Sequence, residues 1–73
     1  MTFAEWFRGS GWTQASFARR IGAPRQTVQS WLTGQRVPTL YYALAVEVLS
    51  DGAVAPVEWL STQQHLALRG MRS

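Results

Sequence analysis

Four residues at fixed intervals constrain the fold of this chain more than any other feature. Gly22 follows Ala18 by four residues, and Val28 and Trp31 follow Ala18 by ten and thirteen. Two short helices that pack at about 90–120° across a tight turn need this order of residue types. The small residue lets the backbones approach, glycine takes the left-handed turn without steric cost, and the two larger residues fill the angle. We therefore expect two short helices joined at Gly22.

Capping residues predict where the first two helices begin and end. Thr2 and Glu5 form a T-x-x-E capping box at the start of a first helix, which Gly9-Ser10-Gly11 ends. Thr13 is a good N-cap for the second helix, and Gly22 is its expected left-handed terminator.

Two further helices follow from the same kind of signal. A third begins near Pro24 or Arg25 and stops at Gly34. A fourth takes Pro38 into its first turn and ends at Asp51-Gly52. Its apolar residues recur at helical spacing, as Leu40, Leu44 and Val48. A short helical turn is expected after these four, over residues 56–60.

The length of 73 residues allows one small domain. We predict an all-α fold, a compact bundle of four to five short helices, within residues 1–60. The helix pair occupies residues 14–33. Residues 61–73 form a C-terminal tail, either helical or disordered.

Composition excludes several classes of protein. The chain has no cysteine and a single histidine, His65, so neither a disulfide nor a zinc site is expected, and no cofactor is implied. The four carboxylates are scattered, and no pair supports acid–base catalysis, so an enzyme is not expected. No apolar run reaches the roughly 20 residues of a membrane span, and the start is unlike a signal peptide, so we expect a cytoplasmic protein.

Positive charge is concentrated on the predicted helix pair. No acidic residue lies between Glu5 and Glu47. A basic face on a pair of helices is typical of proteins that meet phosphate. The interval carries five of the seven basic residues, Arg8, Arg19, Arg20, Arg25 and Arg36.

The order of residues across the pair resembles a known family. It reads Thr13-Gln14-x-x-Phe17-Ala18-x-x-Ile21-Gly22-x-x-Arg25-Gln26-Thr27-Val28-x-x-Trp31-Leu32-Thr33-Gly34-x-Arg36-x-Pro38. This pattern is similar to the helix-turn-helix of the Cro/phage-repressor family. Trp31-Leu32-x-Gly34 and Ala43-Leu44-Ala45-Val46-Glu47 are most similar to the small YdaS-type Cro-like regulators. The resemblance covers about residues 12–60, and it implies that the third helix reads the DNA major groove while the second lies across the backbone.

The outward side of the third helix carries the expected base contacts. With Val28, Trp31 and Leu32 inward, the outward residues are polar or basic and none is acidic. Arginine can bind guanine O6 and N7, and glutamine can bind adenine N6 and N7. The candidates for base contacts are Arg25, Gln26, Ser30, Gln29 and Thr27.

Contacts with the DNA backbone are expected around this helix. Gln14 matches a family position at the start of the second helix, where the helix N-terminus favours phosphate. The full set of candidates is Gln14, Thr33, Gln35, Arg36, Arg8, Arg19 and Tyr41.

One position departs from the family pattern. The family usually places Ser or Thr where Pro24 stands, and proline has no side-chain oxygen with which to cap. The sequence allows the helix to begin one residue early, with Pro24 in its first turn and Ala23 as a poor cap.

Late apolar residues leave two alternatives open. Val57, Trp59 and Leu60 follow four helices that already close a core. They form either a dimer surface or ordinary packing against the first helix.

These observations predict a sequence-specific regulator of transcription that binds double-stranded DNA. It would act as a Cro-like repressor in the cytoplasm, at the nucleoid, occupying a palindromic operator as a homodimer with half-sites about 34 Å apart. The alternative from another class is an antitoxin or adaptor of a toxin–antitoxin pair, which would bind a protein partner as well as DNA.

Overall fold

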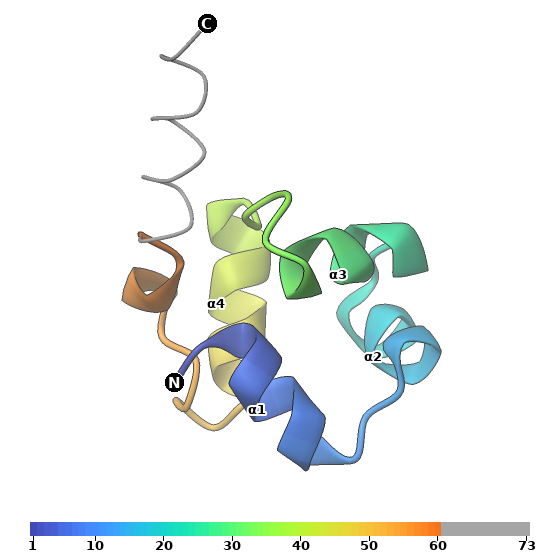
Figure 1. The fold of residues 1–73 in the computed structure, drawn as a ribbon, viewed down its shortest axis with the longest axis horizontal. Helices are drawn as coiled ribbons and strands as arrows, with labels where there is room; N and C mark the ends of the chain where they lie inside the picture. The colour runs from blue at the N-terminus through green and yellow to red at the C-terminus, as the bar shows by residue number, and fades with distance from the viewer. Residues whose placement is uncertain (61–73) are drawn as a thin grey trace, which may run out of the picture.

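The computed structural model describes residues 1–60 of the chain. Within them lie four α-helices and one 3₁₀-helix, joined by loops. No strand occurs in this part, so the predicted all-α fold is confirmed (Figure 1). The predicted tail, residues 61–73, lies outside the described residues. The helices are α1 (Phe3–Ser10), α2 (Gln14–Ile21), α3 (Arg25–Leu32), α4 (Leu40–Leu49) and the 3₁₀-helix η1 (Pro56–Trp59).

Both predicted N-caps are present. At α1 the Glu5 amide donates to the Thr2 hydroxyl at 3.2 Å, and the Thr2 amide donates to the Glu5 carboxylate at 3.0 Å. The hydrogen bonds from the Thr2 backbone and side chain hold the pKa of Glu5 below its ordinary value. At α2 Thr13 and Ser16 make the same reciprocal pair, at 3.0 and 3.1 Å. Each cap therefore satisfies amide groups that the helix itself leaves without a partner.

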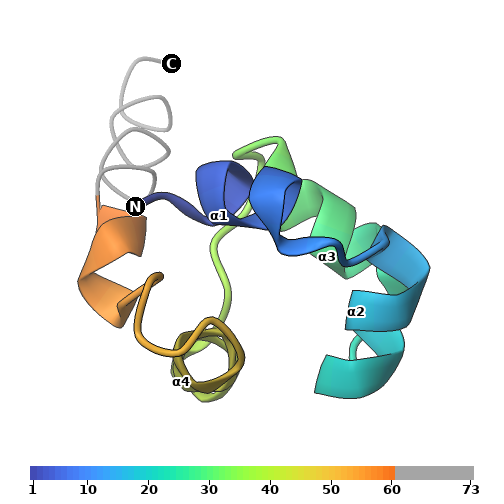
Figure 2. The ribbon, with the colours of Figure 1, turned by 90° about the horizontal axis from the view of Figure 1, so that it is seen from below.

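The turn between α2 and α3 has the predicted geometry. Gly22 ends α2 in the left-handed region, with φ 80° and ψ 27°. Its amide and that of Ala23 both donate to the Ala18 carbonyl, at 2.9 and 3.0 Å. Val28 is fully buried and Trp31 is nearly so, and the Trp31 ring packs against Phe3 of α1, Tyr42 of α4 and Trp59 of η1. Figure 2 shows α2 and α3 at one end of the molecule.

The start of α3 corrects one prediction. Pro24 is the N-cap, with an extended ψ of 146°, and α3 begins at Arg25. The alternative in which Pro24 enters the first turn and Ala23 caps the helix is therefore wrong. The Pro24 carbonyl accepts from the amides of Thr27 and Val28, at 3.0 and 3.3 Å, so the helical hydrogen bonds begin at residue 24. Residue 24 thus serves as the cap although its side chain cannot bond.

We expect Pro24→Ser to leave the free energy of unfolding unchanged or to raise it by up to about 1 kcal/mol. A serine hydroxyl at this N-cap can accept an amide of the first turn, which has no side-chain partner in the present chain. The gain is reduced by the greater flexibility of the unfolded chain without proline. Thermal and urea denaturation measure the change, and a loss above about 1 kcal/mol would contradict this description of the cap.

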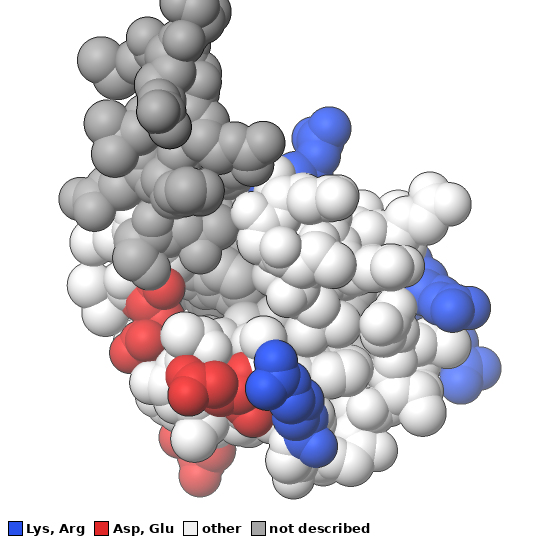
Figure 3. All heavy atoms as spheres, in the orientation of Figure 1, with Lys and Arg blue, Asp and Glu red and all other residues white. Residues whose placement is uncertain are grey.

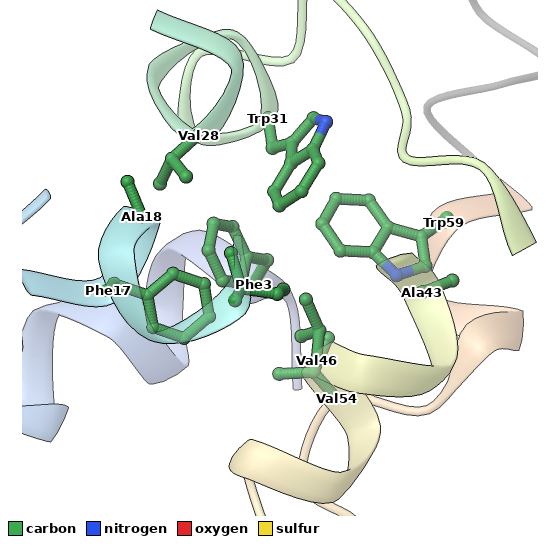
Figure 4. Close-up of a cluster of buried hydrophobic side chains, with 10 residues drawn as sticks. Phe3, Phe17, Ala18, Val28, Trp31, Ala43, Val46, Val54 and Trp59 are labelled. Carbon is green, nitrogen blue, oxygen red and sulfur yellow. The ribbon is translucent and has the colours of Figure 1, made fainter. Parts of the chain in front are cut away.

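A cluster of buried side chains from all five helices forms the core (Figure 4). Phe3 lies at its centre, with ring centroids 5.6 Å from Phe17, 6.1 Å from Trp31 and 5.4 Å from Trp59. Aromatic rings at such distances add packing energy beyond the area that they bury. The buried members are Phe3, Phe17, Ala18, Ile21, Val28, Trp31, Ala43, Val46, Val54 and Trp59.

Helix α4 differs from its prediction in two ways. It begins at Leu40 with Thr39 as N-cap, so Pro38 lies outside its first turn. Val37 and Pro38 are instead half-buried and line a surface hollow together with Trp31 and Tyr42. The buried side of α4 consists of Ala43 and Val46, whereas the apolar residues named from the sequence, Leu40, Leu44 and Val48, are exposed.

Trp59 belongs to the core. Only 8% of its surface is exposed, and its ring packs on Phe3 of α1 and on Trp31, 6.4 Å away. Of the two alternatives for this residue, the structure shows packing against the first helix. The prediction of Trp59 in a dimer surface is wrong because the monomer already covers its side chain. Val57 and Leu60 are exposed, at 62% and 49%.

Candidate nucleic-acid interface

Helix α3 presents one side to the core and the other to solvent. Val28 and Trp31 face inward, while Arg25, Gln26 and Gln29 are exposed. At about 100° per residue, the three exposed side chains fall within one sector of the helix. Three members of the predicted base-contacting set are therefore displayed together over the first five residues of α3, and the other two lie to one side.

Those two members are Ser30 and Thr27, which are half-buried. The Ser30 hydroxyl donates to the Thr27 carbonyl at 2.6 Å, which holds this side chain against its own helix. Its oxygen can still accept a hydrogen bond. Both residues line a surface hollow between α3, the following loop and the start of α4, which also includes Gln26 and Arg36.

The loop after α3 returns towards the helix because of backbone hydrogen bonds. The amides of Gln35 and Arg36 both donate to the Ser30 carbonyl, at 3.0 and 3.3 Å. Gly34 allows this reversal, with φ 76°. Arg36 thereby lines the same hollow as Gln26 and Ser30, although ten residues separate Gln26 from Arg36 in sequence. Thr33, the C-cap of α3, and Gln35 are exposed beside it.

Gln14 is the first residue of α2 and is half-buried. Its Oε1 atom is buried without a hydrogen-bond partner among the residues described. Trp59 Nε1 in the core is likewise buried without a partner among these residues. With the Gln14 oxygen inward, the amide nitrogen is the atom available as a donor next to the positive end of α2.

The other predicted backbone contacts are more dispersed. Arg19 is exposed on the last turn of α2, and Tyr41 is 73% exposed on the first turn of α4. Arg8 is exposed at the end of α1, three residues from Glu5, and its charge contributes to the lowered pKa of that carboxyl. Arg8 therefore lies near an acidic residue of α1, whereas Arg36 lines the same hollow as residues of α3.

Sequence reasoning missed Thr39. It is the N-cap of α4 and makes no side-chain cap hydrogen bond, and it lines the same hollow as Arg36. No side chain therefore caps the amides in the first turn of α4, which lies beside the α3 surface. A helix N-terminus with uncapped amides favours binding of an anion. The signal was Thr39 directly before an apolar run, but the assignment of Pro38 to the first turn concealed it.

Charges of opposite sign are partly separated on the surface, although one basic side chain lies directly beside the acidic group in Figure 3. In Figure 3 the acidic side chains gather at the lower left, and the basic ones lie mainly at the top and right, over the α2–α3 side. The carboxylates beyond Glu5 belong to α4 and the segment after it, as Glu47, Asp51 and Glu58. Within residues 1–60 no arginine pairs with a carboxylate, so the guanidinium groups of Arg25 and Arg36 are available to a phosphate or a base.

Two findings concern other functions. In the described part of the chain, no helix combines the length and the apolar character that crossing a membrane requires. Nowhere in residues 1–60 do three side chains of the kinds that bind metals come together.

Comparison with known proteins assigns the family. A family model described as helix-turn-helix matches residues 5–48, from within α1 to the end of α4. The chain belongs to this helix-turn-helix family. No curated protein and no solved structure matched the chain. The match includes both helices of the pair and thus confirms, at the level of the family, the resemblance seen in the sequence. A helix-turn-helix protein of this family is a DNA-binding regulator of transcription, and the family is typically non-enzymatic.

Proposed function

We propose that this helix-turn-helix protein reads a specific DNA sequence by placing α3 in the major groove. The proposal rests mainly on the exposure of Arg25, Gln26 and Gln29 on one side of α3. The opposite side of this helix is buried in the core. Residues near the N-terminus of such a helix reach base edges first. Thr27 and Ser30 contribute from the flank, where Ser30 acts as an acceptor.

The surroundings of α3 supply contacts with phosphate on both sides of the groove. Gln14 and the N-terminus of α2 bind one strand, with Arg19 nearby. Arg36, Gln35 and Thr33 bind the other, together with Tyr41 and the uncapped start of α4 at Thr39. Such contacts fix the register of the protein on the duplex without reading sequence.

We further propose that the protein is a Cro-like repressor, close to the YdaS-type regulators, that acts at the nucleoid. A homodimer would occupy a palindromic operator within a promoter and exclude polymerase. We do not extend the proposal to an antitoxin role, because no observation on residues 1–60 favours a toxin partner.

A footprint tests this mode of binding. On a duplex that the protein selects from random sequence, hydroxyl-radical cleavage should show two protected half-sites one helical turn, about 34 Å, apart. The same duplex placed across a promoter should lower transcription in vitro. Protection of one half-site alone, or a rise in transcription, would contradict the dimeric repressor.

Arg36→Ala should weaken binding to every duplex and lower the slope of log K against log salt by about one unit. The guanidinium beside α3 is expected to neutralise one phosphate, and phosphate contacts carry no sequence information. Titrations over a salt series with the preferred duplex and a scrambled one measure both effects. A loss of preference between the two duplexes, with an unchanged salt slope, would assign Arg36 to a base instead.

A further inference from the structure

Exposed apolar side chains are confined to one region of the molecule. Six of the seven large ones within residues 1–60 belong to α4, to η1 or to the residue directly after η1, and only Met1 lies elsewhere. Helices α1, α2 and α3 expose none of this class. The six are Leu40, Tyr41, Leu44, Val48, Val57 and Leu60.

Four of these side chains form a continuous strip on α4. Leu40, Leu44 and Val48 follow one another at intervals of four, which stacks them along one side of a helix. They are 70%, 45% and 77% exposed, and Tyr41 borders them at 73%. At about 100° per residue, this strip is opposite the buried Ala43 and Val46. We call Leu40, Tyr41, Leu44 and Val48 the α4 outer face.

The α4 outer face has the extent of an association surface. Its exposed side chains amount to roughly 500 Å², against about 800 Å² per partner in a standard interface, so they would form the apolar centre of such a contact. No charged residue belongs to the strip itself, although the half-buried Glu47, seven residues after Leu40, borders it. Depletion of charge at the centre is typical of interfaces between protein chains.

We propose that the α4 outer face is where two copies of this chain associate, α4 against α4 about a two-fold axis. The inference rests on the proposed function, because a palindromic operator calls for a second copy. An isologous contact needs a surface that is complementary to itself. The leucine and valine side chains at the centre of the strip meet this condition because they carry no charge. Tyr41 at one border of the strip stays available to phosphate, and Glu47 lies at the other border.

The position of α4 at the edge of the molecule leaves its outer face accessible to a second copy. Figure 2 views α4 end-on at this edge, with α1 and α3 on one side of it. The rings of Trp31 on α3 and Tyr42 on α4 lie 5.5 Å apart between centroids, so a side-chain contact links the recognition helix to α4.

The test compares two exposed valines in the full chain. Val48→Glu places a carboxylate in the α4 outer face, and Val57→Glu places one on η1, where the side chain is similarly exposed. Sedimentation equilibrium without DNA should show that Val48→Glu raises the dimer dissociation constant at least about 100-fold, because a charge would be buried in an apolar contact. Val57→Glu should raise it less than about fivefold. Circular dichroism checks that both variants keep the helical fold.

Binding to DNA separates this inference from the proposed function. On duplexes, Val48→Glu should keep wild-type affinity for a single half-site and lose cooperativity on the palindrome. If Val48→Glu dissociates the dimer but the wild type binds all duplexes equally, the association surface is supported and the sequence-specific reading of DNA is contradicted. Cooperative binding by a wild type that is monomeric without DNA also supports the surface, provided that Val48→Glu removes the cooperativity.

Three results would overturn the inference. The first is dissociation by Val57→Glu with no effect of Val48→Glu, which would move the contact to η1. The second is a wild type that neither self-associates near 1 mM, the weak end of protein affinity, nor binds the palindrome cooperatively. The third is a wild type that stays monomeric both alone and on the palindrome and melts at a lower temperature after Val48→Glu, which would show that the strip is covered within a single copy.

Discussion

Replacing Trp59 with alanine is expected to lower the free energy of unfolding by about 3–5 kcal/mol. Only 8% of the surface of Trp59 is exposed, and its ring packs on Phe3 and Trp31 in the core. A domain of this size has a stability of only about 5 kcal/mol, so the variant would keep at most about 2 kcal/mol. Urea denaturation followed by circular dichroism measures the loss.

The neighbouring Val57 provides a matched control. It belongs to the same 3₁₀-helix but is 62% exposed, so Val57→Ala should change the unfolding free energy by less than about 0.5 kcal/mol. If Trp59→Ala left stability unchanged and instead turned a dimer into a monomer, Trp59 would be an interface residue and the description of the core would be wrong. Light scattering and denaturation on the same sample distinguish the two results.

Arg25→Ala is expected to cost about 1–3 kcal/mol of binding free energy for the preferred duplex and to relax the choice of base at one position. Arg25 is the first residue of α3, exposed, and without an ion-pair partner in the described residues. A guanidinium there can donate to guanine O6 and N7 together, a pairing that no other base offers. Titration of the preferred duplex and its single-base variants measures both the loss and its position.

Arg20→Ala removes the same charge from the last turn of α2, where Arg20 is exposed. We expect this control to keep the full preference among duplexes, with at most a weak and uniform loss of affinity. Equal weakening of all sequences by Arg25→Ala would make Arg25 a phosphate contact. The reading of sequence would then fall to Gln26 and Gln29.

The parts of the fold that were predicted correctly depend on local chemistry. Thr2 and Thr13 cap their helices through bonds to residues three positions on, and Gly22 turns the chain because only glycine takes that backbone at no cost. The outward side of α3 was predictable for the same reason. Once Val28 and Trp31 are assigned to the core, helical periodicity assigns the other side to solvent.

The parts that were missed depend on contacts distant in sequence. Helix α4 is apolar almost all round, so periodicity alone could not show that Ala43 and Val46 face the core while Leu44 does not. The burial of Trp59 depends on rings contributed by α1 and α3. The approach of Arg36 to α3 likewise depends on a loop that folds back onto the Ser30 carbonyl, which no local signal specifies.

The central claim is that α3 reads a specific DNA sequence, and selection of binding sites from a random duplex pool tests it most directly. The selected duplex and a scrambled control would then be titrated over a salt series. We predict one palindromic site, preferred over the control by about 10³-fold or more. Weak binding that is equal for the two duplexes and disappears as salt is raised would contradict the claim and leave only a basic surface.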